Sequence, residues 1–322
     1  MNHGVEIVLT FLGTAGAVPT PHRGLSSTLL QRGGDRILVD CGEGTQRQLI
    51  KAAVGLTQIQ TILLTHLHAD HYLGLPGMLK TWDLWGRTDP VHIHGPRGLL
   101  DLVELLRRII GRTDFPIHWH EQRAGDLLPL TGAHLVAIAT DHRIPSLGWL
   151  LREDDRPGRF DTSRARELGV PYGPACGLLQ RGEAVTTPQG RLVRPDEVLG
   201  PPRPGRRIVL TGDTRPCAPV IEAAHGADLL VHDSTFTTAE QQRAEETYHS
   251  TAREAAEVAL AAGVRKLALT HLSYRHHPRE LHAEAREVFP DCVLPADLDR
   301  MVVPFPEKGP AYLEKELVAP PP

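Results

Sequence analysis

The pattern of hydrophobic and polar positions predicts many short strands separated by helices. Apolar, β-branched runs recur along the chain, and several of them are continuous rather than alternating. Continuous apolar runs are typical of strands that are covered on both faces, as in a layered α/β fold. The expected strands are residues 5–13, 36–42, 60–66, 90–95, 134–140, 146–152, 206–213, 227–234 and 265–272.

Helical stretches between these runs complete an α/β pattern. The expected helices are residues 44–53, 72–83, 97–110, 216–225, 250–262 and 278–288. The fifth is the best marked, because Thr251 and Glu254 have the spacing of a capping box. Gly263 stands where a glycine commonly ends a helix.

One segment, residues 152–205, breaks this rhythm. It is crowded with Pro, Gly and Arg and has few periodic apolar runs. A stretch this long inside a compact domain is either a functional excursion or disordered. Through Arg207 it holds eleven arginines against eight acidic residues, a local excess of three positive charges.

Composition narrows the class of protein. The 322 residues are 41% hydrophobic and 23% charged, which is ordinary for a globular protein. No apolar run approaches the roughly 20 residues that span a bilayer, and the start lacks the pattern of a secretory signal. The four cysteines include no CxxC pair, which argues against a Cys-ligated zinc and suits a reducing cytoplasm. A formal net charge of −4 gives no global attraction for nucleic acid.

Residues 61–77, TILLTHLHADHYLGLPG, place four side chains of metal-ligand type just past an apolar strand. They are His66, His68, Asp70 and His71. Alternation along an extended segment points His66 and His68 the same way, and the following turn can bring the other two to a second ion. Imidazole and carboxylate without thiolate suit Zn²⁺, with Mn²⁺ or Fe²⁺ as alternatives. Solvated histidines at a helix N-terminus are the competing interpretation, but four such residues in six positions favour a metal site.

Other strand ends supply further ligands. His142 follows the strand 134–140, Asp213 ends the strand 206–213 and His271 follows the apolar run 265–270. Side chains at such strand ends face a shared crevice in α/β sheets, although each alone is more often a structural hydrogen-bonding residue. We expect one ion on His66, His68 and His142 and a second on Asp70, His71 and His271. Asp213 is expected to bridge the two.

The remaining histidines compete poorly for a metal. His92 and His94 in VHIHG have HxH spacing, as do His118 and His120 in IHWHE. We attribute both pairs to strand alternation rather than to ligation. His276 and His277 lie in a polar turn and are expected to be solvated.

The HxHxDH run with scattered partners resembles the metallo-β-lactamase superfamily of αββα hydrolases. The flanking segments narrow this to a resemblance to the ribonuclease Z family, from about residue 5 to residue 303. They read FLGTAGAVPT, GLSSTLL, LVDCGEGTQRQL, THLHADHYLGLPGML, TGDTR, VHDSTF, YHSTAREAA and LTHLSYR. The resemblance implies an α/β, four-layer αββα fold in one domain of residues 1–322. It also implies an inserted, flexible tRNA-binding arm at 152–205, with a GP motif at Gly173–Pro174, and the same seven ligands.

The resemblance further implies an activity. The protein would be a zinc-dependent endoribonuclease with two Zn²⁺ per subunit, which removes the 3′ trailer from precursor tRNA. The tRNA would keep a 3′-hydroxyl and the trailer a 5′-phosphate. Asp70 would be both ligand and proton acceptor. His249 in YHST would contact the scissile phosphate and protonate the leaving oxygen, oriented by Asp233 in VHDST, where the family often has Glu.

The resemblance also implies a homodimer. The cysteine usage and the lack of a long apolar run predict a cytoplasmic protein without membrane association. Two other functions stay open, a hydrolase of small phosphodiesters, sulfates or thioesters and a non-catalytic RNA-binding module. One departure concerns the loop PTPHRG (19–24), where many relatives have PxKxRN, a pattern associated with recognising a CCA end. Pro21 and Gly24 replace its Lys and Asn, so sparing of CCA-bearing tRNA is left open.

Overall fold

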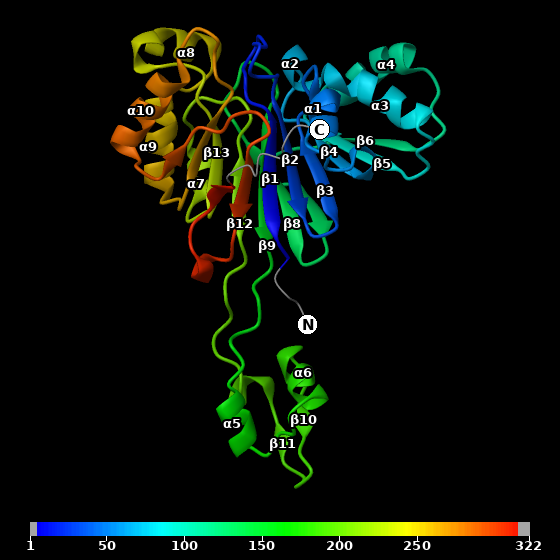
Figure 1. The fold of residues 1–322 in the computed structure, drawn as a ribbon, viewed down its shortest axis with the longest axis vertical. Coiled ribbons are helices and arrows are strands. Elements are labelled where there is room, and N and C mark those ends of the chain that lie inside the picture. The colour runs from blue at the N-terminus through cyan, green and yellow to red at the C-terminus, as the bar shows by residue number, and fades with distance from the viewer. Residues whose placement is uncertain (1–4, 315–322) are drawn as a thin grey trace, which may run out of the picture. The chain divides into compact units, whose positions relative to one another are not determined.

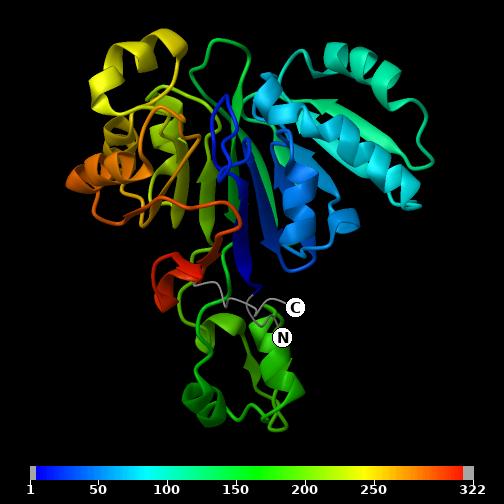
Figure 2. The same cartoon turned by 45° about the horizontal axis from the view of Figure 1, so that its top comes forward.

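The structure, a computed structural model, describes residues 5–314. Its described chain forms two compact units: the insertion Glu153–Gly205, and a larger unit made of the residues before and after it. The larger unit contains two β-sheets packed face to face, with helices on both outer faces (Figures 1 and 2). This four-layer arrangement is the αββα fold expected from the sequence.

The first sheet has eight strands, and its order is β17-β16-β1-β2-β3-β4-β5-β6. The strands from β17 to β3 pair antiparallel, whereas those from β3 to β6 pair parallel. Their bounds are β17 Tyr312–Glu314, β16 Arg300–Val303, β1 Ile7–Gly13, β2 Ser27–Arg32, β3 Asp35–Val39, β4 Thr61–Leu63, β5 Val91–Gly95 and β6 Ile117–Glu121.

The second sheet has seven strands in the order β15-β14-β13-β12-β9-β8-β7. The strands from β12 to β15 run parallel, so their carboxyl ends meet at one edge. Their bounds are β15 Cys292–Val293, β14 Leu267–Thr270, β13 Leu229–Asp233, β12 Arg207–Leu210, β9 Leu147–Glu153, β8 Ala133–Ala139 and β7 Leu127–Leu130.

Apolar side chains fill the space between the sheets and under the helices. Phe11 and Trp149 come from opposite sheets and pack in the central core. A second core joins the first sheet to its helices, where Trp82 is fully buried and its indole donates to the carbonyl of Leu56. Burying one such large side chain contributes about 1.5–3 kcal/mol, so these layers position the strand ends firmly.

Helices on the first sheet are α1 Thr45–Lys51, α3 Gly74–Leu84 and α4 Leu99–Ile110, and those on the second are α7 Ala218–Ala224, α9 Ala252–Ala262 and α10 Pro278–Val288. Two shorter helices are α2 Ala69–Tyr72 and α8 Gln241–Thr247, and the 3₁₀ turns are Leu56–Gln58, Pro195–Glu197, Thr238–Glu240 and Pro306–Lys308. The capping box of α9 is confirmed, since Thr251 and Glu254 bond reciprocally. Gly263 ends α9 at φ 61°.

The nine expected strands and six expected helices are all present, with ends shifted by a few residues. The helix expected over 72–83 corresponds to α3, which begins at Gly74, whereas Tyr72 is the last residue of the separate helix α2. Several elements escaped the sequence analysis. They are β2, β6, β7, β15, β16, β17, α2 and α8, most of which are short or carry polar residues.

The insertion Glu153–Gly205 has a small core of its own. Its elements are α5 Thr162–Glu167, α6 Pro174–Gln180, β10 Val185–Thr186 and β11 Leu192–Val193. Leu168, Leu179 and Val193 are buried in that core. Gly173 precedes α6 at φ 120°, a backbone conformation that only glycine adopts without strain.

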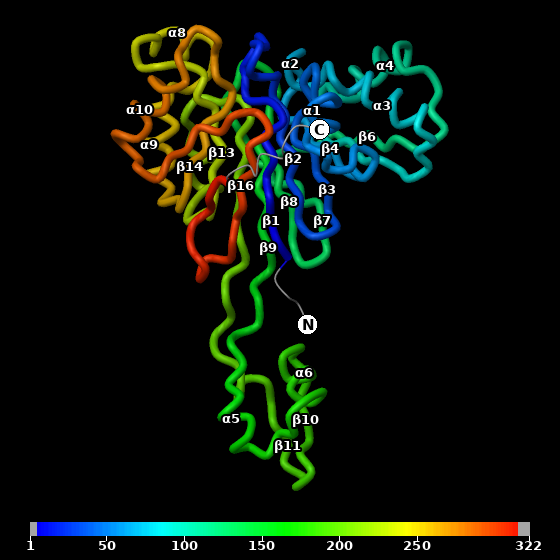
Figure 3. The backbone as a smooth tube through the Cα atoms, viewed as in Figure 1, coloured from blue at the N-terminus to red at the C-terminus, as the bar shows by residue number. Residues whose placement is uncertain are grey.

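The chain leaves and re-enters the larger unit on neighbouring strands. β9 and β12 pair antiparallel from Trp149 opposite Leu210 to Arg152 opposite Arg207, and Figure 3 traces the two strands. The insertion therefore begins and ends beside two strands that are hydrogen-bonded to each other up to its boundaries. Within the part of the chain that the structure describes, no helix is long and apolar enough to cross a membrane.

Candidate metal centre

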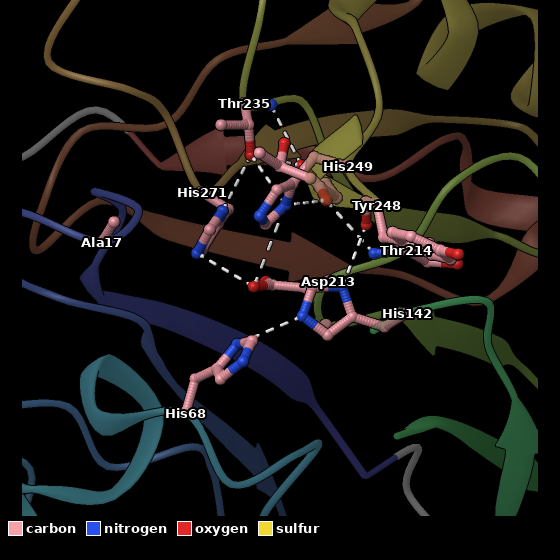
Figure 4. A network of polar contacts seen from close by, with 12 residues as sticks. Ala17, His68, His142, Asp213, Thr214, Thr235, Tyr248, His249 and His271 are labelled. Atoms are coloured by element: carbon pink, nitrogen blue, oxygen red, sulfur yellow. Dashed lines mark hydrogen bonds and ion pairs between the residues drawn. The ribbon is translucent and has the colours of Figure 1, made fainter. Parts of the chain in front are cut away.

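The carboxyl ends of strands from both sheets bring all seven expected ligand residues together. His66 and His68 follow β4, and α2 presents Asp70 and His71. The second sheet supplies His142 after β8, Asp213 after β12 and His271 after β14. Figure 4 shows several of these side chains pointing toward one another. Sequence neighbours and distant strand ends therefore build one site.

The first group consists of His66, His68, His142 and Asp213, whose ligand atoms all lie within 4.8 Å of one another. His68 Nδ1 is 3.0 Å from His66 Nε2 and 3.2 Å from His142 Nε2. A carboxylate oxygen of Asp213 is 3.4 Å from His66 Nε2. This is the set that the sequence analysis expected around one ion, with its expected bridging carboxylate.

The second group consists of Asp70, His71 and His271. The Nε2 atoms of His71 and His271 are 3.4 Å apart, and His271 Nε2 is 3.4 Å from Asp70 Oδ2. Asp213 Oδ2 is also 3.3 Å from His271 Nε2 and 3.4 Å from His71 Nε2. One carboxylate oxygen of Asp213 thus borders both groups.

These contacts fit cations better than they fit a protein-only network. Ligand atoms held about 2.0–2.1 Å from a tetrahedral ion lie roughly 3.3 Å apart, close to the 3.0–3.4 Å measured between the ring nitrogens. Asp213 is buried, and its Oδ1 has no hydrogen-bond partner among the residues described. An unsatisfied buried carboxylate oxygen is costly unless a positive charge compensates it.

The electrostatics of the cluster favour cation-binding forms of His66 and Asp213, whereas Asp213 and Asp40 outweigh burial and raise the pKa of His71 well above its usual range. Burial, followed by the neighbouring His71, holds the pKa of His66 well below its usual range, so His66 stays neutral with a lone pair available. Burial opposes ionisation of Asp213, but the imidazoles of His271 and His71 outweigh it and hold its pKa well below the usual range. Asp213 is therefore ionised at neutral pH.

Partners on the far side of the rings fix their orientation. Asp40 Oδ2 lies 2.8 Å from His71 Nδ1, and Thr235 Oγ1 lies 2.9 Å from His271 Nδ1. The backbone carbonyl of Tyr248 lies 2.9 Å from His142 Nδ1. Such contacts set the tautomer and raise the basicity of a metal-ligating imidazole. The backbone N–H of Ala17 donates to Asp70 Oδ2 over 2.8 Å.

These supporting groups were not found by the sequence analysis. Among these groups, Asp40 alone had a signal in the sequence, since this carboxylate directly follows the strand β3. The carbonyl of Tyr248 and the N–H of Ala17 belong to the backbone, so the residue types at these positions do not predict the contacts. In the loop FLGTAG, the backbone N–H groups of Thr14, Ala15 and Gly16 all donate hydrogen bonds to oxygen atoms of the protein itself.

His249 and Asp233 form a pair beside the seven residues. His249 Nδ1 is 2.8 Å from Asp233 Oδ2, and its ring stacks on His271 with centroids 5.1 Å apart. Asp233 is buried and also accepts from the N–H groups of Thr214 and Thr235. Burial works against protonation of His249, but Asp233 and then Asp213 outweigh it and raise its pKa to about 9.

Asp233 therefore contacts His249 although its side chain is shorter than the Glu that the family often has at this position. Asp213, Asp233, His249 and His271 also form a third group of ligand atoms within 4.8 Å. The roles of all these residues as ligands or catalysts stay predictions.

Histidines outside the centre divide into two kinds. The expectation that His276 is solvated is wrong: it lies 2.8 Å from Glu240, and its side chain is only 10% exposed. His277 is exposed and caps α10.

The fold and the ligand cluster together define the class of protein. The family model of the metallo-beta-lactamase superfamily matches residues 22–156, and that of the beta-lactamase superfamily domain matches residues 197–272. A metallo-beta-lactamase fold protein from Bacillus subtilis is 18% identical, covers 93% of this chain and 100% of its own, and superposes with a TM-score of 0.68. The chain has the metallo-β-lactamase fold.

Relatives then fix the family. A ribonuclease Z of Myxococcus xanthus is 52% identical over 87% of this chain and 92% of its own length. One from Methanosarcina acetivorans is 44% identical over 92% of this chain and 98% of its own. The short form of human tRNase Z is 27% identical, covers 93% of this chain and 99% of its own, and has a TM-score of 0.66. The chain belongs to the ribonuclease Z family, whose members are nucleases acting on phosphodiester bonds.

Proposed function

We propose that this protein removes the 3′ trailer from precursor tRNA by hydrolysing one phosphodiester bond. The products are a tRNA with a 3′-hydroxyl and a trailer with a 5′-phosphate. The observation that carries the proposal is the His249–Asp233 pair, 2.8 Å apart, beside a seven-residue ligand cluster in a chain of the ribonuclease Z family.

Two divalent ions are part of the proposal, with Zn²⁺ favoured by the imidazole and carboxylate donors and Mn²⁺ or Fe²⁺ as alternatives. His66, His68 and His142 would hold one ion and Asp70, His71 and His271 the other. Asp213 would border both. When bound, such ions supply a water of lowered pKa and neutralise charge on the scissile phosphate.

Asp70 is the proposed proton acceptor for the attacking water as well as a ligand. Its Oδ2 is held by the N–H of Ala17 and lies near His271. Its Oδ1 makes no hydrogen bond to a described residue, so this oxygen is available to a water at the reacting centre. The carboxylate is partly exposed, which allows the water to reach it.

His249 is the proposed general acid. A departing ribose oxygen needs a proton, and a positioned imidazolium supplies one. Asp233 keeps the His249 ring cationic and binds its Nδ1, which lies 3.9 Å from Asp213 Oδ2, so Nε2 is the nitrogen left for the substrate. This division of work resembles the triad principle, in which a buried carboxylate orients a proton-transferring histidine.

The insertion Glu153–Gly205 is the proposed binding arm for tRNA. Arg159 and Arg166 are exposed and form no ion pair among the residues that the structure describes. Tyr172 is 95% exposed beside the GP motif, so an aromatic ring faces the solvent as these arginines do. The eight arginines of the insertion equal its eight acidic residues in number, and the local excess of three comes from Arg152, Arg206 and Arg207 at its two ends. Phosphate contacts from such a surface weaken as the salt concentration rises.

A homodimer in the cytoplasm completes the proposal. Ile50 and Leu73 are 53% and 49% exposed and line one shallow cavity, which gives a second copy an apolar surface to cover. All four cysteines are free thiols, as a reducing compartment keeps them. Analytical ultracentrifugation tests the dimer, and a monomer at micromolar concentration would refute it. Subcellular fractionation tests the compartment, and recovery outside the cytoplasm would refute that assignment.

The central experiment incubates an end-labelled precursor tRNA with the Zn²⁺-loaded protein and maps the cut and both end groups. We expect a single cut at the tRNA–trailer junction with the two ends named above. A second arm of the experiment uses bis(p-nitrophenyl) phosphate, an aryl sulfate and a thioester. Turnover of a small substrate without cleavage of the precursor would instead favour a small-molecule hydrolase of the same fold.

Replacement of residues 155–200 by a short Gly-Ser linker tests the arm separately. The pairing of β9 with β12 does not depend on those residues. We expect hydrolysis of bis(p-nitrophenyl) phosphate to persist and precursor cleavage to be lost. Unchanged precursor cleavage by the deletion variant would show that the arm does not bind tRNA.

A further inference from the structure

A second histidine cluster lies on the first sheet, away from the proposed centre. His92 and His94 on β5 pair in register with His118 and His120 on the parallel neighbour β6. Alternate residues of a strand share a face, so the four imidazoles form a two-by-two array on one face. Each HxH motif alone indicated only strand alternation, but the register brings the two motifs together.

This array lies where the sheet has no partner layer. The core between the sheets takes side chains from β1, β2, β3, β4 and β16, and none from β5 or β6. On that face Leu63 of β4 neighbours His94, which marks the change from apolar to imidazole side chains. The opposite face is apolar, because Val91 and Ile93 pack under the helices. In Figure 1, β5 and β6 lie at the outer end of the sheet.

The rings contact one another closely. His92 Nδ1 is 3.2 Å from His120 Nε2. The ring of His118 stacks on His92 with centroids 4.8 Å apart, and that of His94 stacks on His120 at 4.5 Å. No carboxylate among residues 5–314 forms an ion pair with any of these four rings.

We propose that this cluster is a third metal site, which binds one late first-row divalent cation such as Zn²⁺, Ni²⁺ or Cu²⁺. Imidazole is the protein ligand that suits these ions best in the absence of thiolate. His92 Nδ1 and His120 Nε2 hold the ion, because their 3.2 Å separation is close to the roughly 3.3 Å between two ligands of a tetrahedral ion. The rings are nearly parallel with centroids 5.5 Å apart, so the two nitrogens face each other and one ring turns to aim both lone pairs at the ion.

The other two histidines have different parts in this site. His118 is exposed, so its ring can turn about its side-chain bonds to become the third ligand. His94 is buried, and Gln122 Nε2 donates to its Nδ1 over 3.2 Å. His94 therefore serves as the fixed base against which His120 stacks. An ion held between β5 and β6 would cross-link the edge strand to the sheet, and this inference does not rest on the proposed function.

The test uses the full chain, loaded at the proposed catalytic centre and freed of loosely bound metal. Zn²⁺ alone is then titrated into it by isothermal calorimetry. We expect one further equivalent to bind per chain, and H92N/H120N to lose that equivalent. The matched control is H225N/H277N, which removes two exposed imidazoles elsewhere and leaves Asn as a competent cap of α10. The control is expected to keep the equivalent.

A further equivalent that H92N/H120N retains would place the cation elsewhere and overturn the proposal. Absence of any further equivalent in the unmodified protein would leave a hydrogen-bonded histidine stack only, which also overturns it. Because asparagine could disturb the edge strand, crystals of the unmodified protein soaked in Zn²⁺ give an independent measurement. An anomalous difference peak between His92 and His120 is expected at the zinc edge, and its absence would contradict the site.

Discussion

Histidines gather at two places in this molecule, and their surroundings differ. At the proposed centre, the rings of His71, His142 and His271 each have an oxygen partner on the nitrogen that faces away from the cluster. In the β5–β6 array, His92 and His120 contact each other, and no carboxylate balances them. Burial and the neighbouring imidazoles lower the pKa of His94 to about 4.

The difference separates two ways in which a fold can offer imidazoles. Oxygen partners fix ring orientation and tautomer before a cation arrives, so a preorganised site binds tightly. Rings that only stack on one another are free to reorient, so a cation must order them as it binds, which weakens the site. We therefore expect the centre to respond strongly to substitution and the array to leave the chemistry unchanged.

The largest effect should follow Asp213→Ala. The substitution removes the one carboxylate that borders both ligand groups. Two-metal stabilisation of a transition state is worth several kcal/mol, so precursor cleavage should fall by about 10³-fold or more. Metal content by plasma mass spectrometry should fall with it. Retention of both metal and activity would contradict the shared role of Asp213, and H225N/H277N, which leaves both histidine clusters intact, serves as the control.

His249→Gln should come next. We expect precursor cleavage to fall by roughly 10²–10³-fold, within the range of general acid catalysis, while bound metal stays constant. The loss should be smaller with bis(p-nitrophenyl) phosphate, because p-nitrophenolate leaves without a proton. Equal losses on both substrates would rule out proton donation to the leaving oxygen and point to a positioning role.

Asp40→Asn should have an intermediate effect. Asparagine fits the space and tolerates the φ of 58° at this position, so the fold should survive. Loss of the carboxylate behind His71 should weaken metal binding by about 10–100-fold, measured by competition with a chromophoric chelator. Asp35→Asn, at the start of the same strand β3, is the control. An unchanged affinity would mean that Asp40 only ties down its loop.

The smallest effect should follow H92N/H120N, in the other cluster. Precursor cleavage should stay within about twofold of the unmodified protein, because these half-buried rings touch no residue of the centre and lie outside the proposed catalytic machinery. The measurement is kcat/KM on the same labelled precursor. A tenfold loss would show that the two histidine clusters are coupled, and the comparison between them would fail.

Strand ends made much of the site predictable from sequence. His271 directly follows an apolar strand and Asp213 stands three residues past one, and parallel strands expose their carboxyl ends to one crevice. The layered fold was predictable for a related reason, since continuous apolar runs report burial on two faces. The resemblance added His249, which lies after a short helix and has no such signal of its own.

What the sequence hid depends on contacts between distant segments. The pairing of His276 with Glu240 crosses 36 positions of the chain, so a solvated side chain in that polar turn was a reasonable but wrong expectation. The β5–β6 array needs the register of two parallel strands, which spacing within each strand cannot reveal. Residues of the insertion alternate little, because its core is small and built from scattered apolar side chains such as Leu168 and Leu179.

The direct pairing of β9 with β12, on either side of the insertion, has an evolutionary consequence. Register there is set by the strands themselves, from Trp149–Leu210 to Arg152–Arg207, so the length of chain between them can vary. Doubling a flexible connection adds only about 0.6 kcal/mol of closure cost. If the insertion is the binding arm proposed above, a lineage can exchange one contiguous stretch of gene for another and acquire a new macromolecular substrate. The seven ligand codons lie outside that stretch and are inherited intact.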